Sequence, residues 1–379
     1  MPILPRNRRS ENAILVLEDG SVFTGYSFGA KTKISGEVVF STSMVGYPEA
    51  LTDPSYKGQI LTLTYPLVGN YGVPSPVEKH SILEFFESDD IKVSGLILHE
   101  LCLNPHHWSS TRTLDEWLAS EGVPGIYGVD TRALTKKLRV EGVMLGVLQT
   151  ANTFDEISVA DLQTEACSIP DPNLRDLAGE VSVKEPITYD VKAPKTVVVV
   201  DCGVKNNILR CLLKRHVNVV RVPYDSSSSE VLEHHPQGVL VSNGPGDPKR
   251  CSMTIQTVRE LVDEGIPIFG ICLGVQLLSL ALGGDTYKLK YGHRSQNQPA
   301  YELATGRCYI TTQNHGFAIS EESLRGSELE PWFINANDKT MEGVRHKSKP
   351  VFAVQWHPEA SPGPYDTEFL FDQFLHATR

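Results

Sequence analysis

The first 150 residues alternate short apolar runs with turn-forming residues. Residues 13–17 (AILVL) form an apolar run, Glu18-Asp19-Gly20 breaks it, and a second run begins at 21–23. This pattern predicts a strand, a tight turn and a second strand. The same half contains further β-rich runs at 37–41 and 60–64. It also contains helical patterns at 112–120 and 131–139. We therefore expect a mixed α+β domain here.

The pattern changes after residue 195. Residues 196–200 (TVVVV) form a continuous β-branched run, which is typical of a strand buried on both faces of a parallel sheet. Helical and strand-like segments then alternate: helix 206–215, strand 217–222, strand 238–242, a helix ending near 263, strand 267–270 and helix 273–282. This alternation predicts an α/β domain with a parallel-rich sheet. Ligands of such sheets bind at the carboxyl ends of the strands.

An irregular segment separates the two halves. Residues 170–194 contain four prolines and little periodicity, which favours a domain boundary near residue 190. The predicted organisation is a disordered start at 1–12, an N-terminal domain at 13–188, a linker at 189–195 and a second domain at 196–379.

Composition narrows the class of protein. The chain has 379 residues, a net charge of −11 and seven cysteines without a CxxC pair or zinc-like spacing. The charge argues against a non-specific nucleic-acid binder. No apolar run approaches the roughly 20 residues of a membrane span, and the start of the chain lacks a signal-peptide pattern. We expect a cytoplasmic protein without a bound metal, and a mitochondrial version stays open.

Cys272 occupies an unusual local sequence. In PIFGICLGVQLL it lies where a predicted strand becomes a helix, between Gly270 and Gly274. Small neighbours permit the sharp turn of a nucleophile elbow, with cysteine in the place of serine. The following helix N-terminus favours a thiolate, and the amide of Leu273 is a candidate oxyanion donor. Most lone cysteines are core residues, but this setting favours a nucleophile.

A histidine and a carboxylate follow the last predicted strand. Residues 351–356 (VFAVQW) lead directly into His357-Pro358-Glu359. In an extended backbone, positions i and i+2 point to the same side, so Glu359 can orient the imidazole of His357. Alone, an HPE tripeptide is more typical of a surface histidine. Together with the elbow, it predicts a Cys–His–carboxylate relay, provided that the two strands are neighbours.

A glycine-rich loop completes a recognisable set of motifs. SNGPGDP (242–248), GICLGVQ (270–276) and HPE occur in this order on an α/β frame, and the chain thereby resembles the class I glutamine amidotransferases. TQNHGFA (312–318) and HPEASPGP narrow the resemblance. In the N-terminal half, GEVVFSTSMVGYPEALTDPSYKGQILTLTYPLVGNYGV and GVDTRALTKKLR are similar to the small subunits of carbamoyl phosphate synthetases, or to the leading segment of the fused pyrimidine-pathway enzyme.

The resemblance implies a γ-glutamyl thioester mechanism. Cys272 would attack the carboxamide of glutamine, His357 would move the proton, and Glu359 would orient His357. Gly244 and Leu273 would supply the oxyanion amides. The glutamine would be held by residues from several motifs, namely Ser55, Gly246, Gln276, Asn314, Gly316 and Phe317. Because Ser55 comes from the N-terminal half, the site is expected near the domain interface.

One departure and one absence qualify the resemblance. Many relatives have histidine before the glutamine of GICLGVQ, where this chain has Val275; we expect altered thioester turnover and retained hydrolysis. The chain shows no P-loop motif and has no room for ATP-binding synthetase domains. We therefore expect no cofactor in this chain, with ATP, magnesium and bicarbonate used by a large synthetase partner that receives the ammonia and docks on the N-terminal domain.

Two alternatives remain at this point. A glutaminase serving anthranilate, GMP or aminodeoxychorismate synthesis would resemble the C-terminal half only, so the long N-terminal domain argues against it. A catalytically silent scaffold would not need Cys272, His357 and Glu359. The sequence leaves open whether the product enters pyrimidine or arginine synthesis.

Overall fold

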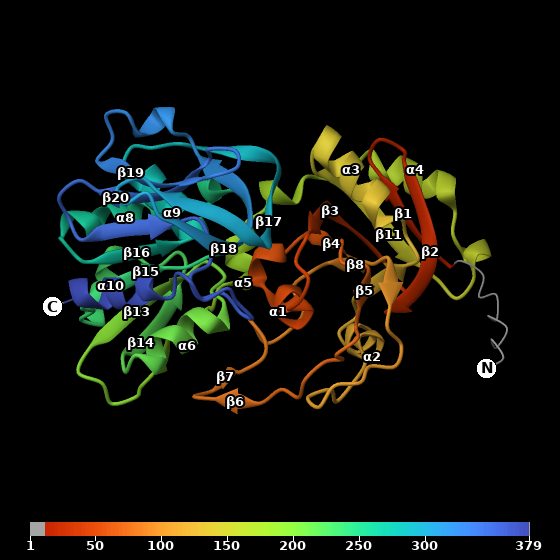
Figure 1. Ribbon diagram of the computed structural model, residues 1–379, viewed down its shortest axis with the longest axis horizontal. Coiled ribbons are helices and arrows are strands. Elements are labelled where there is room, and N and C mark those ends of the chain that lie inside the picture. The colour runs from red at the N-terminus through yellow and green to blue at the C-terminus, as the bar shows by residue number, and fades with distance from the viewer. Residues whose placement is uncertain (1–11, 379) are drawn as a thin grey trace. The chain divides into compact units, whose positions relative to one another are not determined.

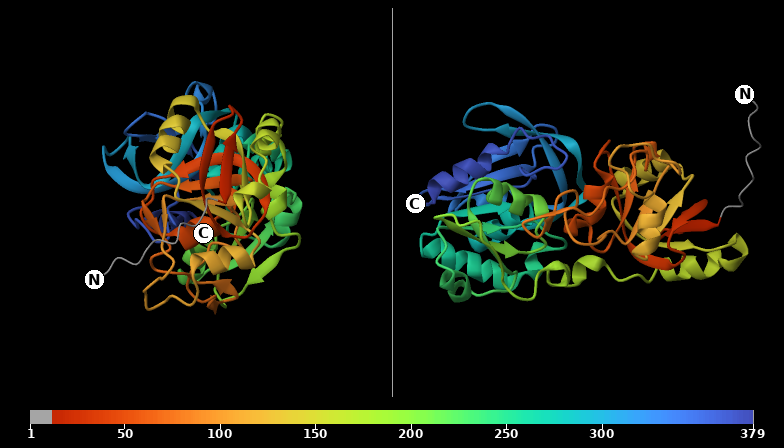
Figure 2. Two further views of the ribbon diagram at one scale, coloured as in Figure 1. Left: turned by 90° about the vertical axis from the view of Figure 1, so that its right-hand side faces the viewer. Right: turned by 90° about the horizontal axis from the view of Figure 1, so that it is seen from below.

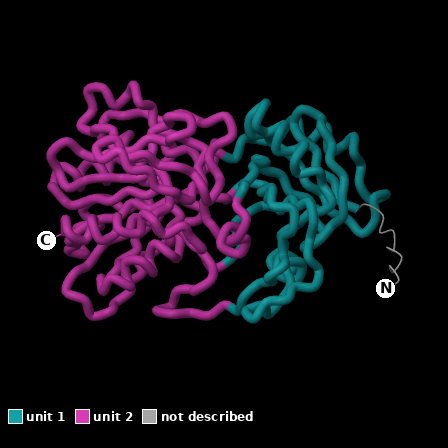
Figure 3. Tube along the Cα trace, viewed as in Figure 1, with its two compact units in different colours: residues 1–42, 58–75, 90–172 teal, residues 43–57, 76–89, 173–379 magenta. Residues whose placement is uncertain are grey.

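The structure, a computed structural model, describes residues 12–378. The predicted disordered start lies outside the described residues, apart from Asn12. The described chain forms two compact units (Figure 3). Unit 1 takes the described residues up to 42 together with 58–75 and 90–172, and unit 2 takes 43–57, 76–89 and the described residues from 173 onward. The predicted linker at 189–195 stays a prediction.

Unit 1 is built around a closed barrel with the strand order β1-β11-β3-β4-β8-β10-β2. These strands are β1 (Ala13–Leu17), β2 (Val22–Gly29), β3 (Lys33–Ser41), β4 (Gln59–Leu63), β8 (Gly95–Ile97), β10 (Pro124–Tyr127) and β11 (Met144–Thr150). The unit also contains a two-stranded sheet of β5 (Leu67–Val68) and β9 (Glu100–Leu101). Its α-helices are α2 (Leu114–Ser120), α3 (Thr131–Glu141) and α4 (Val159–Ala166).

The apolar run at the start of the described chain forms strand β1, which is buried on both faces. All five of its residues are buried. Ile14 and Val16 pack with Leu162 of α4 on the outside of the barrel, so the residues between them face the interior. The predicted tight turn is confirmed, because β1 pairs antiparallel with β2 and Gly20 adopts φ 82° between them.

Unit 2 contains a ten-stranded sheet with the order β12-β14-β13-β15-β16-β21-β20-β18-β17-β19. Its strands are β12 (Ile187–Tyr189), β13 (Thr196–Asp201), β14 (Asn218–Pro223), β15 (Gly238–Val241), β16 (Ile268–Ile271), β17 (Thr286–Glu302), β18 (Cys308–Ile319), β19 (Leu329–Asn335), β20 (Met341–His346) and β21 (Val351–Val354). Strands β14, β13, β15, β16 and β21 pair in parallel, and the remaining pairings are antiparallel. The predicted parallel-rich α/β domain is confirmed.

Helices cover both faces of the parallel part (Figure 1, Figure 2). Alternate residues of β13 point to opposite faces: Val198 and Val200 belong to one apolar cluster, and Val197 and Val199 to another. The first cluster includes residues of α7 (Ser228–Glu233), α8 (Ser252–Asp263) and α9 (Leu273–Ala281), and the second includes residues of α6 (Asn206–Lys214) and α10 (Phe369–Ala377). Burial on both faces accounts for the uninterrupted valine run.

Unit 2 also takes two segments from the first ninety residues. They carry α1 (Tyr47–Thr52) and a hairpin of β6 (Glu78–Lys79) and β7 (Ile82–Leu83), while α5 (Leu177–Val181) follows later in the chain. Among the described residues, no helix is both long and apolar enough to cross a membrane.

Two predicted boundaries need correction. The helix expected at 112–120 begins at Leu114, because Thr113 forms a capping box with Glu116. The strand expected at 351–356 ends at Val354; His357 forms an isolated antiparallel bridge with Thr312, and a turn follows at Pro358 and Glu359. The antiparallel part of the sheet, from β17 to β20, was not predicted.

Candidate active site

Cys272 lies on a sharp turn between β16 and α9. Its backbone adopts φ 56° and ψ −102°, which is costly for a residue with a side chain. Two glycines make the turn possible. A β-carbon on Gly274 would lie 2.2 Å from the carbonyl oxygen of Val241, and one on Gly270 would lie 2.8 Å from the β-carbon of Ala353. The expected elbow is therefore present, with small residues where the backbones approach.

The strands that carry Cys272 and His357 are neighbours, as the relay requires. β16 pairs in parallel with β21, and the amide of Cys272 donates to the carbonyl of Val354 at 2.9 Å. Two residues beyond Gln355, the amide of His357 donates to the carbonyl of Thr312 at 2.9 Å. The HPE segment then turns, since the amide of Ala360 donates back to the carbonyl of His357 at 3.2 Å.

This turn, rather than an extended strand, brings the carboxylate to the imidazole. Nδ1 of His357 lies 2.6 Å from Oε1 of Glu359, and both residues are buried. Burial and the nearby Lys205 lower the pKa of His357, but Glu359 and the thiol of Cys272 outweigh them and raise it above its usual value. Nε2 of His357 makes no hydrogen bond of ordinary geometry within the described residues. The thiol of Cys272 is nevertheless near enough to raise the pKa of the imidazole.

Lys205 and Asp53 extend the relay, and neither was predicted. Nζ of Lys205 lies 3.2 Å from Asp53 and 3.8 Å from Oε1 of Glu359. Burial raises the pKa of Asp53, but Lys205 outweighs burial and lowers this pKa below its usual value. The pKa of Glu359 is likewise lowered against the effect of burial, first by His357 and then by Lys205. Lys205 follows β13 at the carboxyl edge of the sheet, where ligands of such sheets bind, but no sequence motif distinguishes it.

The predicted glutamine-binding residues lie in unit 2, and several of them make hydrogen bonds with other residues of the site. Ser55 accepts a hydrogen bond from the side chain of Asn243 at 3.0 Å. The side-chain amide of Asn314 donates to Asp53 at 3.0 Å. The backbone carbonyl oxygen of Asn314 lies 3.7 Å from Sγ of Cys272. Gln276 donates to the carbonyl of Phe317 at 3.0 Å. Ser55 belongs to the segment 43–57, which clusters with unit 2.

The glycines expected to surround the substrate occupy the loop after β15, which holds Gly244 and Gly246, and strand β18, which holds Gly316. A β-carbon on Gly244 would lie 2.1 Å from the carbonyl oxygen of Cys202 and 2.9 Å from Cδ2 of Leu273, so the loop after β15 lies against the start of α9. Gly246 adopts φ 87° in the same loop, and Gly316 lies beside Arg294. The amide of Leu273 belongs to the first turn of α9, whose N–H groups lack intrahelical acceptors. These amides are available to an oxyanion.

Val275 belongs to the apolar core and not to the polar part of the site. It is fully buried in the apolar cluster that packs α9 against one face of the sheet. A histidine here would place a polar ring among aliphatic side chains. The effect of Val275 on turnover stays a prediction.

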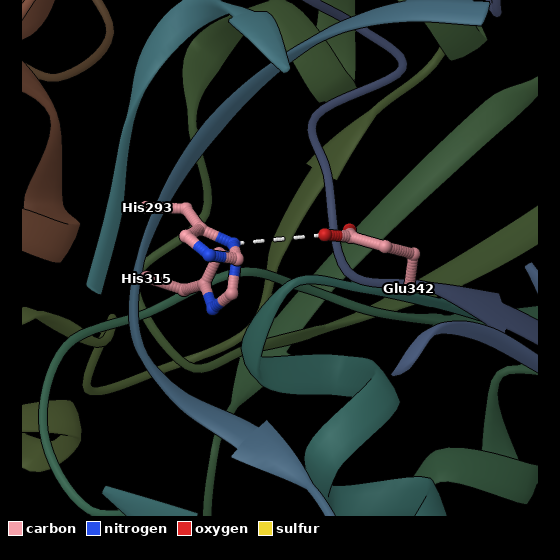
Figure 4. Close-up of side chains that lie close together, drawn as sticks. All are labelled: His293, His315 and Glu342. Atoms are coloured by element: carbon pink, nitrogen blue, oxygen red, sulfur yellow. Dashed lines mark ion pairs between the residues drawn. The ribbon is translucent and has the colours of Figure 1, made fainter. Parts of the chain in front are cut away.

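A second buried polar cluster lies in the antiparallel part of the sheet. Figure 4 shows the rings of His293 and His315 close together, with the carboxylate of Glu342 directed toward them. Nδ1 of His293 lies 3.6 Å from Glu342, and its Nε2 lies 2.8 Å from Asp338. Although burial lowers it, these two carboxylates raise the pKa of His293 to about 9.

The spacing of these three side chains is compatible with a metal ion, but most of their polar atoms already have hydrogen-bond partners; the exception is the buried Nδ1 of His293. The two oxygens of Glu342 accept from Asn335 at 2.9 Å and from Gln313 at 2.8 Å. Nδ1 of His315 lies 2.8 Å from the carbonyl oxygen of Phe317. The cluster therefore ties β17 and β20 to β18, the strand that carries Asn314 and Phe317.

Comparisons with known proteins cover both parts of the chain. The family model for glutamine amidotransferase class-I matches residues 198–377, and the model for the CPSase domain of the carbamoyl-phosphate synthase small chain matches residues 15–148. Over 367 residues, the chain is 50% identical to the carbamoyl phosphate synthase small chain of Methanopyrus kandleri, which covers 97% of this chain and 99% of that one.

Two further relatives are similarly close. The small chain from Pyrococcus furiosus is 51% identical over 364 residues, with coverage of 95% of this chain and 96% of the relative. The arginine-specific small chain from Aspergillus clavatus is 48% identical over 379 residues, with coverage of 99% and 81%. The resemblance found in the sequence motifs thus extends over nearly the whole chain.

Proposed function

Because the chain belongs to the family of carbamoyl phosphate synthase small chains, which are glutamine amidotransferase subunits, we propose that it hydrolyses L-glutamine through a cysteinyl thioester. The reaction would release glutamate and ammonia. The observation that carries this proposal is the placement of Cys272 on a strained elbow beside the buried His357–Glu359 pair.

The first half-reaction forms the thioester. The thiol proton of Cys272 passes to Nε2 of His357, and the sulfur attacks the carboxamide carbon of glutamine. Negative charge then develops on the carboxamide oxygen, where the amides of Gly244 and Leu273 stabilise it. When the tetrahedral intermediate collapses, the C–N bond breaks and the imidazolium gives its proton to the leaving amine.

The second half-reaction returns the free enzyme. His357 takes a proton from water, the resulting hydroxide attacks the thioester carbonyl, and the C–S bond breaks to release glutamate, while His357 returns the proton to the departing sulfur. Throughout, Glu359 holds Nδ1 of His357 at 2.6 Å, which fixes the ring orientation and stabilises its charged form.

Recognition of glutamine is assigned to residues of α9, β18 and two other segments of unit 2. We propose that Ser55, Gly246, Gln276, Asn314, Gly316 and Phe317 hold the substrate. Support comes from their shared surroundings: the side chains of Asn314 and Ser55 meet Asp53 and Asn243, and the carbonyl of Asn314 contacts the sulfur. Backbone groups of the stretch 314–317 are suited to the α-amino and α-carboxylate groups of an amino acid.

The ammonia is proposed to pass to a carbamoyl phosphate synthetase large chain. In this assignment the chain itself uses no cofactor, and the partner uses ATP, magnesium and bicarbonate. Unit 1, which carries none of the proposed catalytic residues, is the proposed docking surface. The product would serve pyrimidine or arginine synthesis, and the similarity to an arginine-specific chain supports the latter. We propose a cytoplasmic location, since all seven cysteines are free.

Two measurements test this function. A glutaminase assay is run on the chain alone and with a synthetase large chain, and glutamate release is expected in both, with carbamoyl phosphate formed only in the complex. A glutamine-derived chloroketone is expected to label Cys272, identified by mass spectrometry, and to leave the exposed Cys308 unlabelled. If neither glutamate release nor labelling occurs, the catalytic assignment is wrong and the scaffold alternative gains support.

A further inference from the structure

Gln355 is the side chain that donates to the nucleophile. It lies between the end of β21 and His357 and is fully buried. Its Nε2 donates a hydrogen bond to Sγ of Cys272 at 3.8 Å. We propose that Gln355 is a further catalytic residue, whose amide stabilises the sulfur whenever it carries negative charge. This inference rests on the proposed thioester function.

The orientation of the Gln355 amide follows from its neighbours. The carbonyl of Phe317 can only accept, so the group of Gln276 that lies 3.0 Å from it must be Nε2. That Nε2 also lies 3.1 Å from the other end of the Gln355 amide, which must therefore be Oε1. The NH₂ group of Gln355 is then left to face the sulfur. A flipped amide would place two donors together and an acceptor against the sulfur.

The backbone holds this contact in place on both sides. The amide of Gln355 donates to the carbonyl of Glu342 at 2.7 Å, and the amide of Cys272 donates to the carbonyl of Val354 at 2.9 Å. The donor and the sulfur are thus fixed by adjoining strands of one sheet. A preorganised donor stabilises charge without the cost of reorienting during the reaction.

The two neighbours of the sulfur suit two different protonation states. The carbonyl oxygen of Asn314, 3.7 Å from Sγ, accepts from the neutral thiol. The amide of Gln355 instead donates, and its hydrogen bond strengthens when the acceptor is a thiolate. The sulfur carries this charge before it attacks glutamine and again when water displaces it from the thioester. Gln355 thereby favours both steps without supplying a proton.

A structural role for Gln355 predicts a different outcome, so the two can be separated. If Gln355 only supports Gln276, its loss should weaken glutamine binding and raise KM. If it stabilises the sulfur, its loss should lower kcat and shift the pH dependence of thiolate formation. The second effect can be measured without glutamine, by alkylating Cys272 with iodoacetamide over a range of pH.

The test uses the full-length chain with Gln355→Met, which keeps the size and removes the donor. At pH 7 we expect alkylation of Cys272 to slow by about tenfold and kcat to fall by about 10- to 100-fold, with KM within about threefold of the parent. Gln355→Glu keeps the shape but presents an acceptor, and should slow alkylation further. This second variant also serves if the methionine variant does not fold.

The control is Asn335→Leu, which removes another buried amide whose partner is Glu342. It is expected to leave the alkylation profile unchanged. Identical profiles for Gln355→Met and the parent, or equal shifts in Gln355→Met and Asn335→Leu, overturn the inference. If the parent chain itself neither hydrolyses glutamine nor is alkylated at Cys272, the proposed function fails instead, and the two failures are distinguishable.

Discussion

The two units of this chain bury very different side chains. In the described part of unit 1, Glu37 is the single charged side chain that is buried, and strand β1 is apolar throughout. Unit 2 buries Lys205 with Asp53 and Glu359, and His293 with Glu342. Because buried charges are costly unless they are paired, unit 2 tolerates an energetic burden that unit 1 avoids. The difference separates an apolar core from one that contains buried ion pairs.

The largest effect is expected at the nucleophile. Cys272→Ser should reduce glutamine hydrolysis by on the order of 10⁵-fold, because a serine hydroxyl at this position is a far weaker nucleophile than a thiolate. Steady-state glutamate release measures the loss. Cys308→Ser, at an exposed position, is the matched control and should retain full activity; a comparable loss in both variants would contradict the assignment.

Removing the buried cation should cost stability in unit 2. Lys205→Met removes the cation that lies between the buried carboxylates of Asp53 and Glu359. We expect a loss of about 3–5 kcal/mol in the free energy of unfolding. Urea denaturation measures this change.

The control for that variant is Lys214→Met. The side chain of Lys214 is 72% exposed, and its ion pair with Glu368 spans 3.3 Å. Surface pairs of this kind contribute about 0–1 kcal/mol. Equal losses for the two lysine variants would show that the burial of Lys205 does not govern its contribution.

A core substitution in unit 1 should affect stability alone. Leu148 is fully buried, and a β-carbon on Gly95, in a strand that is not its neighbour, would lie 3.0 Å from its Cδ2, so the side chain crosses the barrel interior. Leu148→Ala should lower the free energy of unfolding by about 2–4 kcal/mol. The folded fraction should hydrolyse glutamine at the parent rate. A fall in kcat without unfolding would break the division between the units.

The smallest effect depends on pH. Burial, followed by the nearby Glu87, raises the pKa of Glu49 from 4.5 to about 7. The folded state therefore binds a proton more tightly than the unfolded state, so this group favours folding fully below pH 4.5, and the contribution is lost as the pH rises through 7. Glu49→Gln should equal the parent near pH 4.5 and be more stable by about 1 kcal/mol at pH 8, after allowance for solvent screening. Denaturation curves at both pH values decide this; a constant difference would contradict it.

The sequence predicted those parts of the molecule that depend on local patterns. The valine run of β13, the glycines beside Cys272 and the HPE motif predicted the parallel sheet, the elbow and the His357–Glu359 pair, because each signal lies within a few residues. The predicted strand end at Trp356 was wrong, because β21 ends at Val354 and a turn brings Glu359 to His357.

Non-local features could not be predicted in the same way. Closure of the barrel depends on pairing between strands as far apart as β1 and β11. Lys205 has no distinctive neighbours in the sequence, and only the fold brings it to Asp53. The contact between Gln355 and Cys272 requires the pairing of β16 with β21.

The positive φ angle of Cys272 also bears on how this protein can change over generations. Glycine adopts such angles without penalty, so Cys272→Gly should relax the turn while it eliminates the reactive sulfur. Selection for robustness and selection for activity therefore pull in opposite directions at this codon. In a lineage that no longer needs glutamine hydrolysis, substitution of Cys272 by glycine should be favoured, because it would remove the activity and stabilise the fold.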